Sequence, residues 1–403
     1  MPTDSDLTWF RYFPGQTPDD YRWSSAFALA LGTSHWGGST MSELHHIGQA
    51  LSDRVGEDDA WFDEWARAGG QLQDLGDEAA AAGNQITAGD LYLRACVYYQ
   101  MAERFVVPKT AASAAVFDAS LNCFEHFAEL NLQCDLTRVD ISSDAGVLPA
   151  WYLPATSRST SPGPAVVFSG GLDITKEIQF CMGARELARR GIACLVVDGP
   201  GTGEALRHEG ITLRHDYEIA GSAAYDYLAS RTDTDPNRIG IMAVSLGGYY
   251  ATRCAAKDPR FAACVAWGAI WDYHATWEKR INQAYQTSLS VPGDHICWVL
   301  GVEDTDKALE VLRDFTLEGV VDDLRCPFLV VHGTEDAQVP LEDAHRLFEH
   351  AGSESKFLRE FGPAEGGAQH VQIDYLPAAT SYIADWLSAH LAGSPAVNGA
   401  KDK

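Results

Sequence analysis

The amino-acid sequence predicts an α/β protein, with a mostly parallel sheet covered by helices on both faces and a helical domain ahead of it. The first observation is a series of short apolar runs after residue 136, which alternate with helical segments. Continuous apolar runs are typical of parallel strands buried on both faces. The second observation is a helical spacing of apolar residues between residues 41 and 135. A chain of 403 residues is long enough to hold both units.

Residues 1–40 combine many aromatic side chains with turn-forming residues. We expect an N-terminal arm that packs on the rest of the protein and has little regular structure. Residues 41–135 are predicted to form a helical domain of three or four helices, because residues such as Trp61 and Trp65 recur at helical spacing. Pro108 fits the first turn of another helix, since proline lacks the N–H that a first turn leaves unpaired.

Residues 136–392 are predicted to form the sheet domain. Its strand candidates are the apolar runs at residues 166–168, 193–197, 239–244, 263–267 and 328–331. The alternation stops for about 60 residues after the fourth run, which is too long for a simple crossover. We therefore expect a partly helical cap insertion at about residues 270–322, over one end of the sheet. Residues 393–403 are expected to be a flexible tail.

Composition excludes several function classes. Lysine and arginine number 30 against 56 aspartate and glutamate residues, a formal net charge of −26. Such a surface repels phosphate backbones and anionic membranes, so we expect neither nucleic acid nor a membrane as partner. The N-terminus lacks the features of a signal peptide, and no apolar run reaches 18 residues. Nine cysteines without a CxxC pair indicate free thiols in a reducing compartment, so a cytoplasmic protein is expected.

A candidate nucleophile lies in the segment Ala243-Val244-Ser245-Leu246-Gly247. A buried strand precedes Ser245, and a helix rich in small residues follows it. The spacing is that of the nucleophile elbow G-x-S-x-G, with Ala243 in place of the first glycine. Small residues on either side allow the strand and the helix to approach closely at a strained turn. An ordinary serine at a helix N-terminus is the alternative interpretation.

A serine hydroxyl needs a base to take its proton, and the base needs a carboxylate to orient it. In sheets of this kind the three groups follow the chain order serine, acid, histidine. The turn after the run at residues 328–331 offers Glu335 and Asp336. We prefer Asp336, because a short side chain is easier to fix rigidly beside an imidazole.

Four histidines follow this turn, and His370 is the predicted base. It lies in a glycine-rich loop just before the last helix, from which its side chain can reach the serine. The other three are expected on helices: His345, His350 and His390.

The loop after residues 166–168 contains Gly170-Gly171-Leu172. Glycines let the backbone come close to a ligand, so the N–H of Leu172 or Gly171 is a candidate donor to an oxyanion. The N–H of Leu246 is the second candidate, because it lies at the positive end of a helix. A plain Gly-Gly turn is the alternative. No metal and no cofactor are expected, since HExxH, paired CxxC and a phosphate-loop G-K-[ST] are all missing from the sequence.

At these residues the chain resembles the serine α/β-hydrolases, and within them a subgroup with an N-terminal helical domain. That subgroup includes 2,6-dihydropseudooxynicotine hydrolase, the fungal pigment hydrolases that shorten polyketide naphthopyrones, and the FrsA-type esterases. The segments that carry the resemblance are residues 170–177, 198–204, 245–248 and 259–268 and the His370 loop.

The resemblance implies an α/β-hydrolase fold with Ser245 as nucleophile, Asp336 as acid and His370 as base. It places the oxyanion hole at amides near Leu172 and Leu246. Some members cleave carbon–carbon bonds beside a ketone, with help from an acidic residue on the cap. Glu278 lies at about the position of that acidic residue. A glutamate in a surface salt bridge on a cap helix is an equally good interpretation. Four aromatic residues are candidates for the pocket wall, with core packing as the equal alternative: Tyr250, Trp267, Trp271 and Trp277.

We therefore expect a serine hydrolase that cleaves an ester or a ketone-adjacent carbon–carbon bond of the β-diketone type. The expected substrate is an aromatic, polyketide-like or alkaloid-like small molecule. Acyl transfer or cyclisation in a biosynthetic pathway is one alternative, and a non-catalytic regulatory protein on the same scaffold is another. The resemblance also makes a homodimer an expectation.

Overall fold

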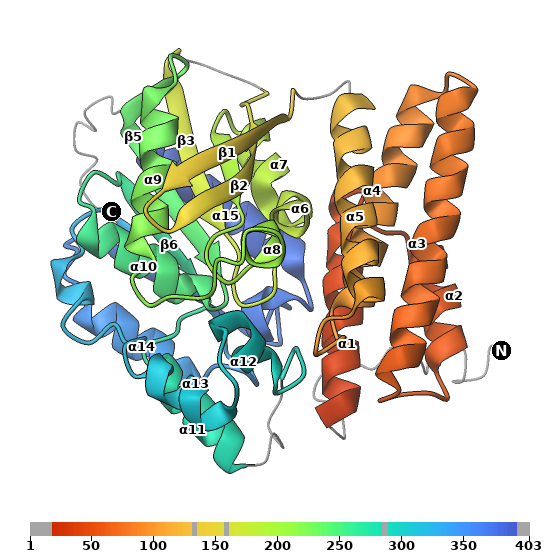
Figure 1. Cartoon of the computed structure of the whole chain (residues 1–403). Helices are drawn as coiled ribbons and strands as arrows, with labels where there is room; N and C mark the ends of the chain where they lie inside the picture. Colours follow the sequence, from red (N-terminus) through yellow and green to blue (C-terminus); the bar gives the residue numbers. More distant parts are fainter. Residues whose placement is uncertain (1–17, 131–134, 157–160, 284–288, 393–403) are drawn as a thin grey trace.

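The computed structural model describes residues 18–130, 135–156, 161–283 and 289–392. Within these ranges, an eight-stranded sheet lies beside a bundle of long helices (Figure 1). The predicted α/β fold with a helical N-terminal part is confirmed. None of the described helices is long and apolar enough to cross a lipid bilayer. The expected tail at residues 393–403 and the start of the N-terminal arm lie outside the described residues.

The N-terminal part consists of a helical bundle. Its elements are α1 (Pro18–Gly32), the short η1 (Thr33–Trp36), α2 (Met41–Leu51), α3 (Asp58–Ala81), α4 (Gln85–Glu103) and α5 (Ala111–Leu130). Helix α5 begins later than the predicted start near Pro108. The cause is Thr110, whose Oγ1 accepts a hydrogen bond from the N–H of Ser113 at 3.1 Å and so caps the helix.

Helix α1 corrects the expectation that residues 1–40 have little regular structure. Most of its described side chains are buried, so apolar residues surround the helix and no single stripe reveals its period. Phe27 contacts the rings of Trp61 and Trp65, with centroids 5.2 Å apart in each case. Both tryptophans are fully buried. Helix α1 is therefore part of the bundle core.

The strand order of the sheet is β1-β2-β4-β3-β5-β6-β7-β8. The strands are β1 (Thr137–Ser143), β2 (Gly146–Leu153), β3 (Gly163–Ser169), β4 (Ala193–Val197), β5 (Thr234–Val244), β6 (Ala263–Trp267), β7 (Phe328–Gly333) and β8 (Lys356–Phe361). The six strands β3 to β8 pair in parallel. At one edge, β2 pairs antiparallel with both β1 and β4. The five predicted apolar runs lie in β3 to β7.

Alternate residues of the central strands contribute to two separate cores. Val166 and Phe168 of β3 belong to the core that includes the bundle and the last helix. Ala165 and Val167 belong to the core on the other face of the sheet. Successive side chains point to opposite faces of the sheet, and both faces are apolar cores. The central strands therefore appear in the sequence as uninterrupted apolar runs.

Helices cover both faces and one end of the sheet (Figure 1). They are α6 (Lys176–Gln179), η2 (Phe180–Ala184), α7 (Arg185–Arg189), α8 (Gly203–Arg207), α9 (Glu218–Ser230), α10 (Gly247–Lys257), α11 (Tyr273–Asn282), α12 (His295–Leu300), α13 (Thr305–Leu312), η3 (Val321–Asp323), α14 (Leu341–His350), η4 (His370–Gln372) and α15 (Leu376–Leu391). Helices α11, α12 and α13 lie in the interval that was predicted to be partly helical, and they gather at the lower end of the molecule in Figure 1.

Candidate active site

Ser245 lies at a sharp turn between β5 and α10. Its φ of 62° is in the left-handed region, which non-glycine residues adopt only under strain. A Cβ on Gly247 would lie 2.6 Å from the Cβ of Ala243 and 2.7 Å from the carbonyl oxygen of Gly170. The turn therefore requires a glycine at 247, and the space that this glycine leaves open accommodates alanine at 243.

Ser245, His370 and Asp336 form a continuous chain of hydrogen-bonding contacts. The Oγ of Ser245 lies 2.8 Å from Nε2 of His370. The Nδ1 of the same imidazole lies 2.7 Å from Oδ2 of Asp336. Ser245 follows β5, Asp336 follows β7 and His370 follows β8. The three residues can meet because parallel strands bring their carboxyl ends to one edge of the sheet. The arrangement can take a proton from the serine and stabilise the resulting imidazolium.

Asp336 is held rigidly in its turn. Its Oδ1 accepts hydrogen bonds from the N–H groups of Gln338 and Val339 at 2.8 and 2.9 Å. Burial on its own would raise the pKa of this carboxyl, but His370 and the other donors hold it below the usual value. Glu335 is exposed and contacts Gln369 instead, at 3.5 Å. The carboxylate beside the imidazole is therefore that of Asp336.

His332 is a buried neighbour of Asp336 that the sequence analysis did not single out. It is buried at the end of β7, with Nε2 3.5 Å from Oδ2 of Asp336 and 3.1 Å from the carbonyl oxygen of Val339. Its Nδ1 accepts a hydrogen bond from the N–H of Ala269 at 3.3 Å, so the ring proton is on Nε2. Burial lowers the pKa of His332, which keeps the ring neutral. The signal in the sequence was a histidine four residues before the acid.

The loop that carries His370 has a strained backbone. Val371 and Gln372 have φ values of 47° and 54°. Gln372 accepts a hydrogen bond from the indole N–H of Trp267 at 2.7 Å. The carboxylate of Asp374 accepts three backbone N–H groups from residues 367–369. These contacts fix the imidazole over the serine.

The other three candidate histidines lie on helices, as expected, and their contacts are elsewhere. His345 lies 2.6 Å from the carboxylate of Glu360. The ring of His350 packs against Trp271, and that of His390 stacks on Trp386.

The loop after β3 packs directly against the serine turn. A Cβ on Gly171 would lie 2.6 Å from the carbonyl oxygen of Val244, 2.9 Å from Cβ of Ser245 and 3.2 Å from the nitrogen of Leu246. Only glycine permits this approach. Within the described ranges, the N–H groups of Leu172 and Leu246 donate no hydrogen bond to the protein. Both are therefore available to an oxygen atom of a ligand.

A buried ion-pair network anchors this loop. The ammonium group of Lys176 lies 2.9 Å from Asp198 and 2.9 Å from Glu204, and it also contacts Glu177 at 2.7 Å. Asp198 accepts a further hydrogen bond from the backbone N–H of Lys176 at 2.8 Å. The glycine-rich segment at residues 198–204 thus serves as a shaped turn that holds the loop after β3. Burial of so many charges is tolerated because each is paired.

A small cavity of about 30 Å³ lies at Ser245. Its walls come from helix α1, from the end of α4, and from loops at the sheet edge. The lining residues are Ser25, Leu29, Arg104, Asp173, Ile174, Met182, Val244, Ser245, Ser290, Gln338, His370, Val371 and Ile373. Gln338 also lines a second cavity of about 450 Å³ beside α11 and α14, together with Asp336. The N-terminal helix thus contributes directly to the wall around the serine.

The five residues expected to contact substrate do not line the cavity at Ser245. Glu278 is exposed on α11, whose inward face carries Trp277. Trp267 and Tyr250 are fully buried, and Tyr250 stacks on a neighbouring tyrosine ring at 3.8 Å. Trp271 lines the second cavity. The cause is core packing, since Trp267 belongs to one hydrophobic core and the other three aromatic residues belong to the second.

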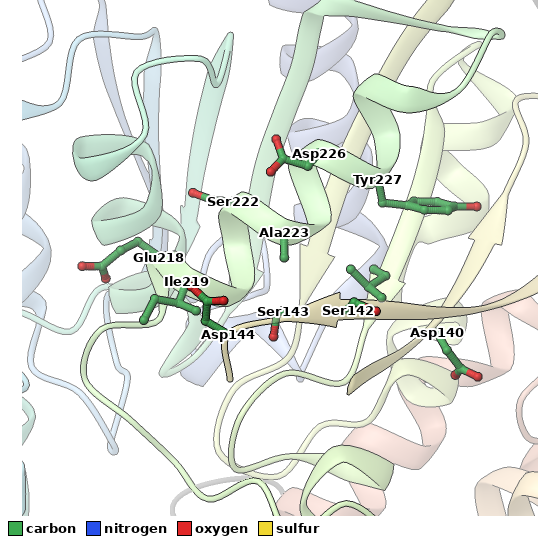
Figure 2. A pocket seen from close by; sticks show the side chains of 11 residues that line it. Asp140, Ser142, Ser143, Asp144, Glu218, Ile219, Ser222, Ala223, Asp226 and Tyr227 are labelled. Carbon is green, nitrogen blue, oxygen red and sulfur yellow. The ribbon is translucent and has the colours of Figure 1, made fainter. Parts of the chain in front are cut away.

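A further groove is remote from this chemistry. It has a volume of about 580 Å³ and lies between β1 and α9, where Asp140, Asp144, Glu218 and Asp226 give it an acidic character (Figure 2). Serine side chains also line it, and the hydroxyl of Ser222 donates a hydrogen bond to the carboxylate of Asp258 at 2.7 Å, but no histidine lines the groove to act as a general base.

Comparisons with known proteins agree with this architecture. Residues 39–356 match the esterase FrsA-like family. Hydrolase acrC of Aspergillus aculeatus is 27% identical over 393 residues, which cover 86% of this chain and 91% of that protein. The 20-hydroxy-prefusarin hydrolase FUS2 of Gibberella moniliformis is 29% identical, over 91% of this chain and 96% of that protein. The crystal structure of the 2,6-dihydroxy-pseudo-oxynicotine hydrolase superposes with a TM-score of 0.74 and 26% identity, over 90% of this chain and 97% of that one. The chain therefore belongs to the FrsA-like esterase family and is a hydrolase of the α/β fold.

Proposed function

We propose that this hydrolase works through Ser245 as nucleophile, His370 as general base and acid, and Asp336 as the group that orients the imidazole. The observation that carries the proposal is the hydrogen-bonded chain from the serine Oγ to the Asp336 carboxylate. Attack on a carbonyl carbon creates an oxyanion beside the free N–H groups of Leu246 and Leu172. His370 then protonates the leaving group, and water releases the acyl group from the serine.

The proposed substrate is an aromatic, polyketide-like or alkaloid-like small molecule, cleaved at an ester or at a carbon–carbon bond of the β-diketone type. Two relatives support this class through the compounds in their names, 20-hydroxy-prefusarin and 2,6-dihydroxy-pseudo-oxynicotine. Both bond types pass through the same tetrahedral oxyanion. The apolar side chains at the cavity, such as Leu29, Ile174 and Met182, suit a substrate of this kind.

The test replaces Ser245 by alanine and measures hydrolysis of p-nitrophenyl esters and aryl 1,3-diketones. Loss of the nucleophile should lower turnover by at least about 1,000-fold. The matched control is Ser230→Ala, at the exposed end of α9, where the hydroxyl only donates to the carbonyl of Tyr227 at 2.7 Å. Unchanged turnover in Ser245→Ala would remove the proposed mechanism.

A fluorophosphonate probe separates the alternatives. Covalent labelling that requires Ser245 is expected for a catalytic serine, whereas no labelling would favour a regulatory protein on this scaffold. Product analysis with and without an alcohol or amine acceptor distinguishes hydrolysis from acyl transfer.

We also propose that the protein acts in the cytoplasm and forms a homodimer. The described cysteines are all free thiols, which supports a reducing compartment. Light scattering of the purified protein tests the dimer, and a mass of one chain would exclude it.

A further inference from the structure

Arg104 is the one permanent cation among the described residues that line the cavity at Ser245. It follows α4 directly, and only 7% of its surface is exposed. Its guanidinium pairs with Asp173, which lies in the loop after β3 and also lines the cavity. The Nε of Arg104 is buried and has no hydrogen-bond partner in the described part of the chain.

A buried guanidinium with an unused donor is costly unless something satisfies it. The ion pair with Asp173 offsets part of that cost in the free protein. Apolar residues line other walls of the cavity, including Ile174, Met182 and Val371. In such a low-dielectric setting a charged donor interacts strongly with an oxygen that gains negative charge.

The position of this cation matters for the type of bond that is cleaved. An ester releases an oxygen anion, which His370 can protonate at the atom that leaves. A 1,3-diketone releases a carbon whose negative charge moves to its second carbonyl oxygen. That oxygen is separate from the oxyanion at the attacked carbon, so it needs a donor other than the N–H groups of Leu172 and Leu246.

We propose that Arg104 binds this second oxygen and makes the site specific for 1,3-dicarbonyl substrates, an inference that rests on the proposed serine mechanism. Ser245 attacks one carbonyl and its proton moves to His370. The bond between the carbonyl carbon and the CH₂ group breaks, and the electron pair leaves as an enolate whose oxygen is held by Arg104. His370 returns the proton to carbon, which gives a methyl ketone. One water then hydrolyses the acyl-serine to a carboxylic acid.

The test compares Arg104→Met, Arg104→Lys and the parent protein on p-nitrophenyl acetate and 1-phenyl-1,3-butanedione. We expect the ratio of diketone to ester turnover to fall about 100-fold in Arg104→Met, as for loss of a charge-assisted bond made in the transition state. Arg104→Lys should recover part of the ratio. Binding of the diketone, measured as competitive inhibition of ester turnover, should weaken in Arg104→Met.

Arg94→Met is the matched control, because it removes an ion pair with Glu43, at 3.1 Å inside the bundle, away from the cavity. Equal losses of ester and diketone turnover in Arg104→Met would overturn the proposal, since they indicate that Arg104 only holds the loop through Asp173. Unchanged turnover of both substrates would also overturn it, as would a parent protein that neither cleaves nor binds the diketone. Failure of the proposed serine mechanism is detected by a separate measurement, since ester turnover would then persist in Ser245→Ala.

Discussion

Asp336 makes hydrogen-bonding contacts through both carboxylate oxygens, and this fixes which ring nitrogen of His370 meets the serine. Two backbone N–H groups hold Oδ1, and His370 contacts Oδ2. The neighbouring Glu335 has the same charge but points to solvent. Variants of these two adjacent carboxylates therefore test whether kcat depends on the position of the carboxylate or only on its negative charge.

Asp336→Asn should lower kcat by roughly 10,000-fold, because an amide no longer stabilises the imidazolium and favours the wrong ring tautomer. Glu335→Gln should change kcat by no more than about two-fold, since an exposed charge there interacts weakly with the site. Steady-state kinetics on a p-nitrophenyl ester measures both variants. Similar losses in the two would contradict the assignment of Asp336.

A second carboxyl gives a prediction for stability against pH. Burial raises the pKa of Asp343 from 3.8 to about 6, and its Oδ2 accepts the N–H of Trp271 at 3.3 Å. A raised pKa means that the folded state holds the proton more tightly than the unfolded state. Stability that is present at low pH is therefore lost as the pH rises from about 4 through about 6, by at most about 3 kcal/mol.

Asp343→Asn removes this loss. The variant should be more stable than the parent at pH 7.5, and the difference should disappear near pH 4. Urea unfolding at both pH values measures it. A stability difference that does not depend on pH would contradict the prediction.

Among the elements, the loop after β3 and the serine turn depend on each other. Gly171 lies so close to Val244 and Ser245 that any side chain would push the two apart. Gly171→Ala should therefore displace the N–H of Leu172 and lower kcat by about 10- to 100-fold, with a smaller effect on KM. Gly70→Ala in α3 is the control, because its Cβ would meet only the hydroxyl of Tyr99, at 3.6 Å. Equal kcat values for Gly171→Ala and the parent would contradict a role for this loop.

The sequence predicted the central strands because burial on both faces leaves an unbroken apolar run. It did not predict β8, where exposed and half-buried residues such as Lys356 and Arg359 interrupt the pattern at the sheet edge. It also missed α1, whose burial on nearly all sides removes the helical stripe. The two failures have opposite causes, because periodicity reveals an element when one face is buried and the other meets water, whereas α1 is buried nearly all round and β8 is partly exposed along most of its length.

At the scale of the whole molecule, the order of serine, acid and histidine along the chain was enough to predict three side chains that meet in space. Their catalytic roles and the domain boundaries stay predictions. Arg104 could not be found in this way, because its place at the cavity comes from contacts between segments distant in sequence. The aromatic residues chosen for the pocket wall do not line the cavity at Ser245, because residue type alone does not distinguish a core from a binding surface.

The residues that line the cavity at Ser245 are spread along the chain from Ser25 to Ile373, so segments near both ends contribute to it. A chain still emerging from the ribosome has no working centre until its final segments have docked. Turnover is accordingly a sensitive reporter of completed assembly, and two fragments of a nicked chain would regain it only by reassociating.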